Sequence, residues 1–254
     1  MIRKLFAALA VVASATAVAD ERPTHVFMAG DSTMSIKHVK DYPETGWGVP
    51  FAYFFDEGIA VDNRARNGRS TRTFIEEGIW QGIVDELQAG DYVIIQFGHN
   101  DQSEHKKDRY TPPETYQANL KRFIADVKKA GASPLLMTPV TRRYFNDQGQ
   151  IEPTHNGYDQ LVREVAEQTG VFFVDMEAVT RAYFTDMGDE LSKLRFMHIG
   201  PDLHPNYPIG VTDDTHFNHL GAREVAQLVL SELKKQQHPL AKRLRVPDPK
   251  HLRQ

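Results

Sequence analysis

Two short segments near opposite ends of the chain together carry a serine hydroxyl and a base that could activate it. Ser32 lies in residues 30–33, and His216 follows Asp213 by three residues. An aspartate can hold an imidazole in the tautomer whose other nitrogen accepts a serine proton, and it stabilises the imidazolium that then forms. These parts are typical of acyl-transfer chemistry.

Two further segments offer hydrogen-bond donors for an oxygen that becomes negative during such a reaction. Gly68, in residues 67–70, lets a backbone N–H approach a ligand without a Cβ in the way. Asn100, in residues 98–101, has a side-chain amide that can donate into the same cleft. Donors of this kind stabilise a tetrahedral intermediate.

Each segment also has a plain structural explanation. A serine after a strand commonly caps the next helix, a glycine commonly forms a turn, and a loop asparagine often hydrogen-bonds its own backbone. The Asp213 and His216 pair could equally be half of a metal site or a helix cap. The occurrence of all four segments in one chain is what favours catalysis.

Five short apolar runs predict the strands that position these segments. Each run is rich in Val, Ile, Phe or Met and ends in polar or small residues, as buried parallel strands do. Stretches of helical periodicity lie between and after them. The predicted strands are residues 25–29, 59–63, 92–97, 134–138 and 171–175, and the predicted helices are residues 47–57, 76–88, 113–130, 158–168 and 220–235.

This alternation predicts a single α/β domain, a three-layer α/β/α sandwich around a parallel sheet of about five strands. Ligands of such sheets bind beyond the carboxyl ends of the strands. Ser32, Gly68 and Asn100 each follow one of the first three predicted strands. We therefore expect all three residues at one edge of the sheet.

The two ends of the chain predict export and a C-terminal tail. Residues 1–19 contain basic residues, a short apolar run and small residues up to Ala19, which is the layout of a secretory signal peptide. Residues 20–254 would then be the domain, with a basic, proline-bearing surface tail from about residue 238. Because the chain has no cysteine for disulfides, we expect a periplasmic or extracellular bacterial protein.

Composition excludes several classes of partner and cofactor. The formal net charge is −4 and no block of basic residues compensates it, so nucleic acid is not an expected partner. No segment has the roughly 20 apolar residues of a transmembrane helix, so membrane insertion is not expected. The histidine spacings match no common ligand set, so the sequence predicts no metal and no other cofactor. The oligomeric state stays open.

The four segments, in this order over residues 30–216, resemble the SGNH (GDSL-like) hydrolase superfamily. The resemblance implies a flavodoxin-like sandwich with Ser32 as nucleophile and Asp213 and His216 as the rest of the triad. It also implies an oxyanion hole made by the backbone N–H groups of Ser32 and Gly68 and the side chain of Asn100. The neighbouring Asp214 is excluded from the triad by the spacing of the motif.

A closer resemblance lies in the residues around these segments, at 29–34, 47–48, 63–70, 97–101, 204–208 and 213–217. Together they are similar to bacterial rhamnogalacturonan acetylesterases, which deacetylate pectic backbones, while some relatives act on xylan. The implied function is a serine esterase that removes acetyl groups from a plant cell-wall polysaccharide through an acyl-enzyme. Which hydroxyl carries the acetyl group, and whether the substrate is a polymer or an oligomer, are not determined by the sequence.

Several side chains near these segments are candidates for binding such a substrate. A guanidinium pairs well with a uronic-acid carboxylate, and an aromatic ring can stack on a sugar. Surface ion pairs are the alternative for the arginines. The candidates are Arg69, Arg72, Arg142, Arg143, Tyr144 and Tyr207.

Three other functions are compatible with the same residues. The chain could be an acetylxylan or other carbohydrate acetylesterase, a lipid or aryl esterase or thioesterase, or a glycan-binding protein without turnover. The absence of a long apolar loop argues against an acyl-chain tunnel, and the competent residue type at every triad position argues against loss of catalysis.

Overall fold

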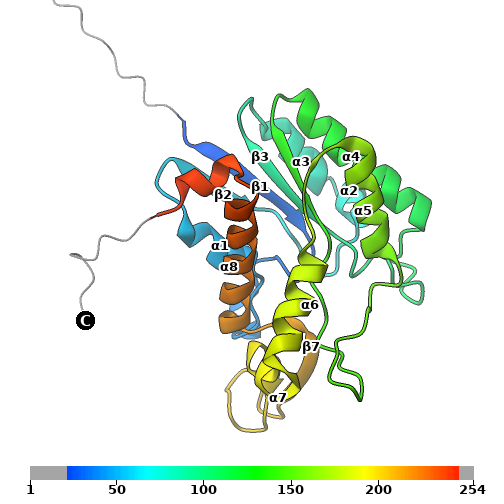
Figure 1. Ribbon diagram of the computed structural model, residues 1–254, viewed down its shortest axis with the longest axis vertical. Helices are drawn as coiled ribbons and strands as arrows, with labels where there is room; N and C mark the ends of the chain where they lie inside the picture. Colours follow the sequence, from blue (N-terminus) through cyan, green and yellow to red (C-terminus); the bar gives the residue numbers. More distant parts are fainter. Residues whose placement is uncertain (1–21, 246–254) are drawn as a thin grey trace, which may run out of the picture.

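A parallel five-stranded sheet forms the centre of the computed structural model, which describes residues 22–245. The predicted signal peptide, residues 1–19, lies outside these residues, as does the end of the predicted tail. The strand order is β2-β1-β3-β4-β5, and all five predicted strands are confirmed (Figure 1). Their bounds are β1 Thr24–Gly30, β2 Ile59–Asn63, β3 Tyr92–Gln96, β4 Ser133–Met137 and β5 Phe172–Val174.

Side chains along β1, β3, β4 and β5 alternate between two hydrophobic clusters. On β1, Val26 and Met28 belong to one cluster, whereas Phe27 and Ala29 belong to the other, and all four are fully buried. This alternation is the period-2 geometry of a strand with both faces covered. It produces the predicted three-layer sandwich.

Helices cover both faces of the sheet (Figure 1). One layer contains α1 Gly48–Phe51, α6 Met176–Met187 and α8 His219–Lys235, and the other contains α2 Thr71–Glu76, α3 Ile79–Glu86, α4 Pro113–Lys129 and α5 Tyr158–Thr169. The shorter helices are α7 Asp189–Ser192, η1 Val39–Asp41, η2 Ala52–Phe54, η3 Lys193–Arg195 and η4 Pro239–Arg243.

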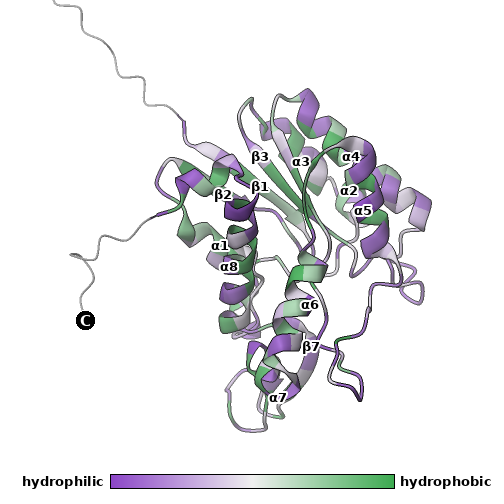
Figure 2. Ribbon diagram, viewed as in Figure 1, coloured by the Kyte–Doolittle hydropathy of each residue, from purple (hydrophilic) through white to green (hydrophobic). Residues whose placement is uncertain are grey.

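The helices are apolar on the side that faces the sheet and polar on the side that faces away (Figure 2). On α4, the residues buried against the sheet layer are Tyr116, Leu120, Phe123, Ile124 and Val127, spaced by three or four as one helical face requires. Within residues 22–245, none of the helices combines the length and the apolar character that crossing a membrane requires.

The ends of α4 are where the sequence predicts them. Pro113 occupies the first turn, where its missing N–H costs nothing. Gly131 has a left-handed φ of +75°, and its N–H donates to Lys128 O at 3.0 Å while Ala132 N–H donates to Val127 O at 3.1 Å. These two bonds form a Schellman motif, which ends the helix and turns the chain into β4.

Several elements were not predicted from the sequence. They include the helices α2, α6 and α7 and a two-stranded antiparallel sheet of β6 Phe196–Ile199 and β7 Val211–Phe217. A signal for α6 exists, because Asp175 caps its N-terminus by accepting from Ala178 N–H and buried residues recur at Met176, Thr180 and Phe184. The mixed charges of β7 give no such pattern.

The predicted surface tail is wrong for residues 238–244, which pack on the core. Leu240 is 1% exposed and belongs to the same cluster as α1 and α8. Leu244 forms a bridge with Phe55, and the Arg243 guanidinium pairs with Asp56 at 2.8 Å. Leu240 and these neighbouring contacts together attach the segment to the core.

Replacing Leu240 with alanine should therefore lower the free energy of unfolding by about 2–4 kcal/mol, the usual cost of truncating a buried leucine. Urea denaturation followed by circular dichroism measures the change. Leu203, whose side chain is 76% exposed, is the matched control, and Leu203→Ala should stay within about 0.5 kcal/mol of wild type. Equal effects of the two substitutions would place residue 240 outside the core.

Candidate active site

The site lies where the strand order of the sheet reverses. The chain goes from β1 to β2 on one side and returns to β3 on the other side, so the loops after β1 and β3 diverge and leave a crevice beyond the carboxyl ends of these strands. Ser32 comes two residues after the end of β1, and Asn100 comes four residues after the end of β3. Gly68 lies in the loop after β2.

The structure brings Ser32, His216 and Asp213 into one hydrogen-bonded chain. Ser32 Oγ is 2.9 Å from His216 Nε2, and His216 Nδ1 is 2.7 Å from Asp213 Oδ2. In the neutral tautomer with the hydrogen on Nδ1, the imidazole donates to the carboxylate and accepts from the hydroxyl. This is the geometry that a serine needs to lose its proton to a histidine.

A bulge in β7 places Asp213 and His216 on the same side. Phe196 pairs with Phe217, but the next residue, Met197, pairs with Asp213, so residues 214–216 have no partner on β6. Asp213 Oδ1 accepts the backbone N–H groups of Thr215 at 2.7 Å and His216 at 3.0 Å. The carboxylate thus replaces the missing ladder partners of the bulge.

Asp213 is ionised in this arrangement. Burial raises the pKa of its carboxyl, but the hydrogen bond and charge of His216 and the two backbone N–H groups outweigh burial and bring the pKa to about 2. The carboxylate therefore carries its negative charge at any pH well above this value. A fixed negative charge at Nδ1 favours the protonated, imidazolium form of His216.

Asp214 holds the bulge in place from its other side. Its Oδ1 accepts from Arg143 Nε and from His198 Nε2, both at 2.7 Å, and its backbone oxygen accepts from Arg143 N–H at 2.8 Å. Arg143 is 6% exposed and also pairs with Asp189. These contacts give a structural role to Asp214, the aspartate that the spacing of the motif excludes from the triad.

The side chain of Asn100 is anchored next to Gly68. Asn100 Nδ2 donates to Arg69 O at 3.0 Å, and because an amide nitrogen has two hydrogens, one remains for another acceptor. Gly68 has a φ of +75°, a conformation that glycine adopts without strain. The loop after β2 thus positions both the glycine N–H and the asparagine amide.

Behind Ser32 lies a buried chain of an aspartate and two histidines that the sequence did not single out. Asp31 Oδ2 is 3.3 Å from His99 Nδ1, and His99 Nε2 is 3.4 Å from His155 Nε2. Burial lowers the pKa of both histidines. Burial raises that of Asp31, but contacts with His99 and with the N–H and hydroxyl of Thr33 keep it below its usual range. Asp31 and His99 had a sequence signal, because they lie beside Ser32 and Asn100 in the sequence.

Asp101 belongs to the loop after β3, and its side chain hydrogen-bonds the first residue of α2, Thr71. Its Oδ1 accepts from Thr71 N–H at 2.9 Å and from the Thr71 hydroxyl at 2.6 Å, while Oδ2 is buried without a partner among residues 22–245. Burial raises the pKa of Asp101 to about 7, against these hydrogen bonds. Its contacts are with α2 and not with Ser32 or His216.

Three of the four candidate arginines already form ion pairs and hydrogen bonds with other groups of the protein. Arg69 pairs with Glu77 and donates to a backbone oxygen. Arg72 pairs with Glu76 and donates to three backbone oxygens of residues 107–110. Arg143 holds the bulge, so its prediction as a sugar ligand is corrected to a structural role.

The other candidate side chains differ in exposure and in whether their polar groups already have hydrogen-bond partners. Arg142 donates only to Thr154 and has no carboxylate partner among residues 22–245. Burial lowers the pKa of Arg142, and charges that include Asp31 and Asp213 oppose this. The ring of Tyr144 is 47% exposed, whereas Tyr207 donates its hydroxyl to Asp41 O at 2.7 Å.

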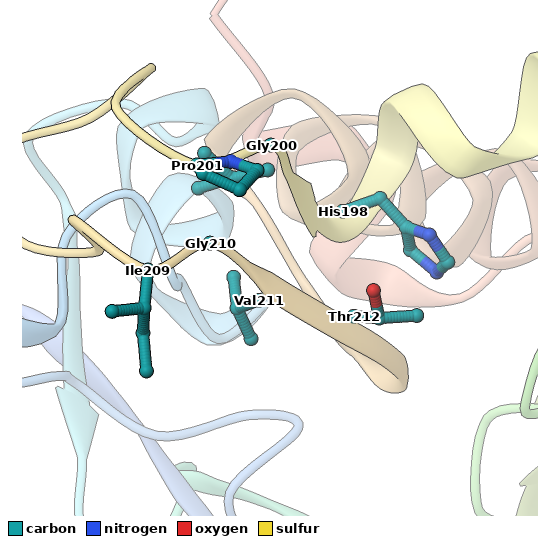
Figure 3. A pocket seen from close by; sticks show the side chains of 8 residues that line it. His198, Gly200, Pro201, Ile209, Gly210, Val211 and Thr212 are labelled. Atoms are coloured by element: carbon teal, nitrogen blue, oxygen red, sulfur yellow. The ribbon is translucent and has the colours of Figure 1, made fainter.

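A pocket of about 470 Å³ lies along the hairpin of β6 and β7 (Figure 3). Figure 3 shows His198 and Thr212 at one end of this pocket and Ile209 and Pro201 toward the other. None of the triad residues lines it. The pocket is therefore separate from the site where Ser32 meets His216.

The GDSL-like Lipase/Acylhydrolase family matches residues 28–223. The rhamnogalacturonan acetylesterase RhgT of Bacillus subtilis is 41% identical over 221 residues, which are 87% of this chain and 94% of that protein. The rhamnogalacturonan acetylesterase of Emericella nidulans is 29% identical over 226 residues, covering 81% of this chain and 82% of that protein.

Solved structures share the fold. The Bacillus subtilis protein YxiM superposes with a TM-score of 0.73 at 26% identity, covering 86% of this chain and 58% of that one. Axe2, an acetylxylan esterase from Geobacillus stearothermophilus, gives a TM-score of 0.56 at 19% identity, covering 84% of this chain and 94% of that one. With the match over residues 28–223, the chain belongs to the GDSL-like Lipase/Acylhydrolase family.

Proposed function

We propose that this protein is a serine acetylesterase that deacetylates a plant cell-wall polysaccharide, with rhamnogalacturonan as its substrate. The hydrogen-bonded chain from Ser32 through His216 to Asp213 supports the chemistry. The similarity to RhgT over nearly the whole chain supports the substrate.

In this mechanism Ser32 Oγ attacks the acetyl carbonyl carbon while His216 Nε2 takes its proton. The carbonyl oxygen becomes negative and accepts hydrogen bonds from the backbone N–H groups of Ser32 and Gly68 and from the free hydrogen of Asn100 Nδ2. The sugar hydroxyl leaves with the proton of His216, and water then hydrolyses the acetyl-enzyme by the same steps in reverse.

Acetylxylan is the alternative substrate. The acetylxylan esterase of Geobacillus stearothermophilus is 28% identical over 138 residues, which are 52% of this chain. The longer and higher similarity to RhgT favours rhamnogalacturonan. Export is part of the proposal, because a polymer of this size is met outside the cytoplasm and residues 1–19 have the layout of a signal peptide.

Wild-type protein should release acetate from acetylated rhamnogalacturonan faster than from acetylated xylan, and Ser32→Ala should reduce release at least about 10⁴-fold because no nucleophile remains. Enzymatic acetate assay measures both. Ser133→Ala, at an exposed serine at the start of β4, is the matched control with normal rates. A wild type that releases no acetate from either polymer would overturn the acetylesterase proposal in favour of longer acyl esters or glycan binding.

Asn100→Ala should lower kcat by about 10²–10³-fold, the usual cost of one oxyanion-hole donor. Asn100→Asp, which keeps the size of the side chain but removes the donor, should be impaired at least as much. Initial rates with a chromogenic acetate ester give kcat, and thermal unfolding checks that both variants fold. Activity of the alanine variant within about threefold of wild type would remove Asn100 from the oxyanion hole.

The pH profile of kcat/KM for a neutral acetate ester should fall on the acid side with a single ionisation, because His216 must be neutral to accept the Ser32 proton. Asp213, with its pKa of about 2, stays ionised throughout and adds no second step. Rates from weakly acid to alkaline pH test this. A limb steeper than one proton would show that another group, such as Asp101, is coupled to turnover.

A further inference from the structure

We propose that Arg109 forms a subsite for the carboxylate of a uronic acid, next to the loop that holds Gly68. The proposal rests on the proposed function, since it describes how a polysaccharide bound at Ser32 would be recognised. It assigns the selectivity for a charged polymer to a residue that the sequence analysis did not single out.

Arg109 lies next to Gly68. A Cβ built on Gly68 would lie 3.0 Å from Arg109 Nη1, so the guanidinium lies directly against the glycine whose N–H is a proposed oxyanion donor. A sugar whose acetyl group reaches Ser32 would therefore have this cation beside it.

The guanidinium of Arg109 is only partly hydrogen-bonded within residues 22–245. Its Nε and Nη2 donate to Asp108 Oδ2 at 3.1 and 2.9 Å, whereas Nη1 has no partner among residues 22–245. Arg69, on the same pocket, has its Nε and Nη2 on Glu77 and its Nη1 on Asn67 O. Arg109 is thus the guanidinium of this pocket that has a free N–H edge for a further acceptor.

A pocket lies on the surface beside Gly68 and Arg109. Residues 67–69 and Arg109 line an open pocket of about 470 Å³, a volume that can hold part of a sugar chain. Asp108 and Glu77 also line this pocket, each paired with its arginine. The side chain of Asp108 is 66% exposed, so water screens its repulsion of an incoming carboxylate.

The loop that carries Arg109 is held by Arg72. Arg72 Nε donates to Tyr110 O at 3.1 Å, and Nη2 donates to Lys107 O at 3.1 Å and Asp108 O at 2.9 Å. These bonds fix the backbone on both sides of residue 109. A binding group on a fixed loop loses little freedom on binding, and Arg72 is accordingly a positioning residue for this subsite.

The test compares two forms of one substrate, acetylated rhamnogalacturonan oligosaccharides with free carboxylates and the same oligosaccharides after methyl esterification. For each variant, acetate release gives kcat/KM on both forms. Wild type should prefer the free acid, and Arg109→Gln should reduce this preference about tenfold, since one partly exposed charge-assisted contact is worth about 1.4 kcal/mol. Arg109→Lys should keep part of the preference because the charge remains.

Arg122→Gln is the matched control. Arg122 lies on α4, is 49% exposed and, among residues 22–245, pairs with Asp126 alone. Arg122→Gln has the same net charge as Arg109→Gln and should keep the wild-type preference. An unchanged preference in Arg109→Gln, or an equal loss on both forms, would overturn the subsite. A wild type that releases acetate from neither form would instead overturn the proposed function itself.

Discussion

The carboxylate of Asp213 is the interaction on which the rest of the site depends. Residues 214–216 have no partners on β6, and a buried N–H without an acceptor costs about 1–3 kcal/mol. Oδ1 of Asp213 accepts two of these N–H groups, and Oδ2 accepts the imidazole hydrogen of His216. One ionised side chain therefore stabilises the bulge and orients the base. In a regular strand, residues three apart point to opposite faces, so without the bulge Asp213 and His216 would not meet.

The bulge must in turn be brought to the end of β1, which is far from it in the sequence. Arg143, in the loop after β4, hydrogen-bonds Asp214 through both its backbone N–H and its guanidinium. Thr45 N–H, in the loop that follows Ser32, donates to Phe217 O at 2.9 Å. The hairpin is thus tied to loops from both halves of the sheet. The distance from Ser32 to His216 is set by these contacts, because β6 and β7 form no ladder with the central sheet.

The sequence predicts the parts of this protein that follow from local pattern. The five strands of the sheet were found because each contains a short apolar run, which is typical of a strand in a parallel sheet covered by helices. The hairpin of β6 and β7 was not found, since β7 contains Asp213, Asp214 and His216 and owes its conformation to contacts with distant residues. Leu240 was missed for a similar reason. Its burial depends on a partner cluster on α1 and α8, which no local pattern reveals.

The roles of arginines are the clearest case of what local sequence does not reveal. A guanidinium near a motif can bind a substrate or hold a loop, and its position in the sequence is the same in both cases. Arg72 flanks residues 67–70 and Arg143 follows β4, yet their N–H groups are used by the backbone of residues 107–110 and by Asp214. Arg109 lies in none of the motifs, yet its Nη1 lies against Gly68. What separates the roles is which N–H groups already have acceptors, since only an unused donor gains a new bond when a ligand arrives.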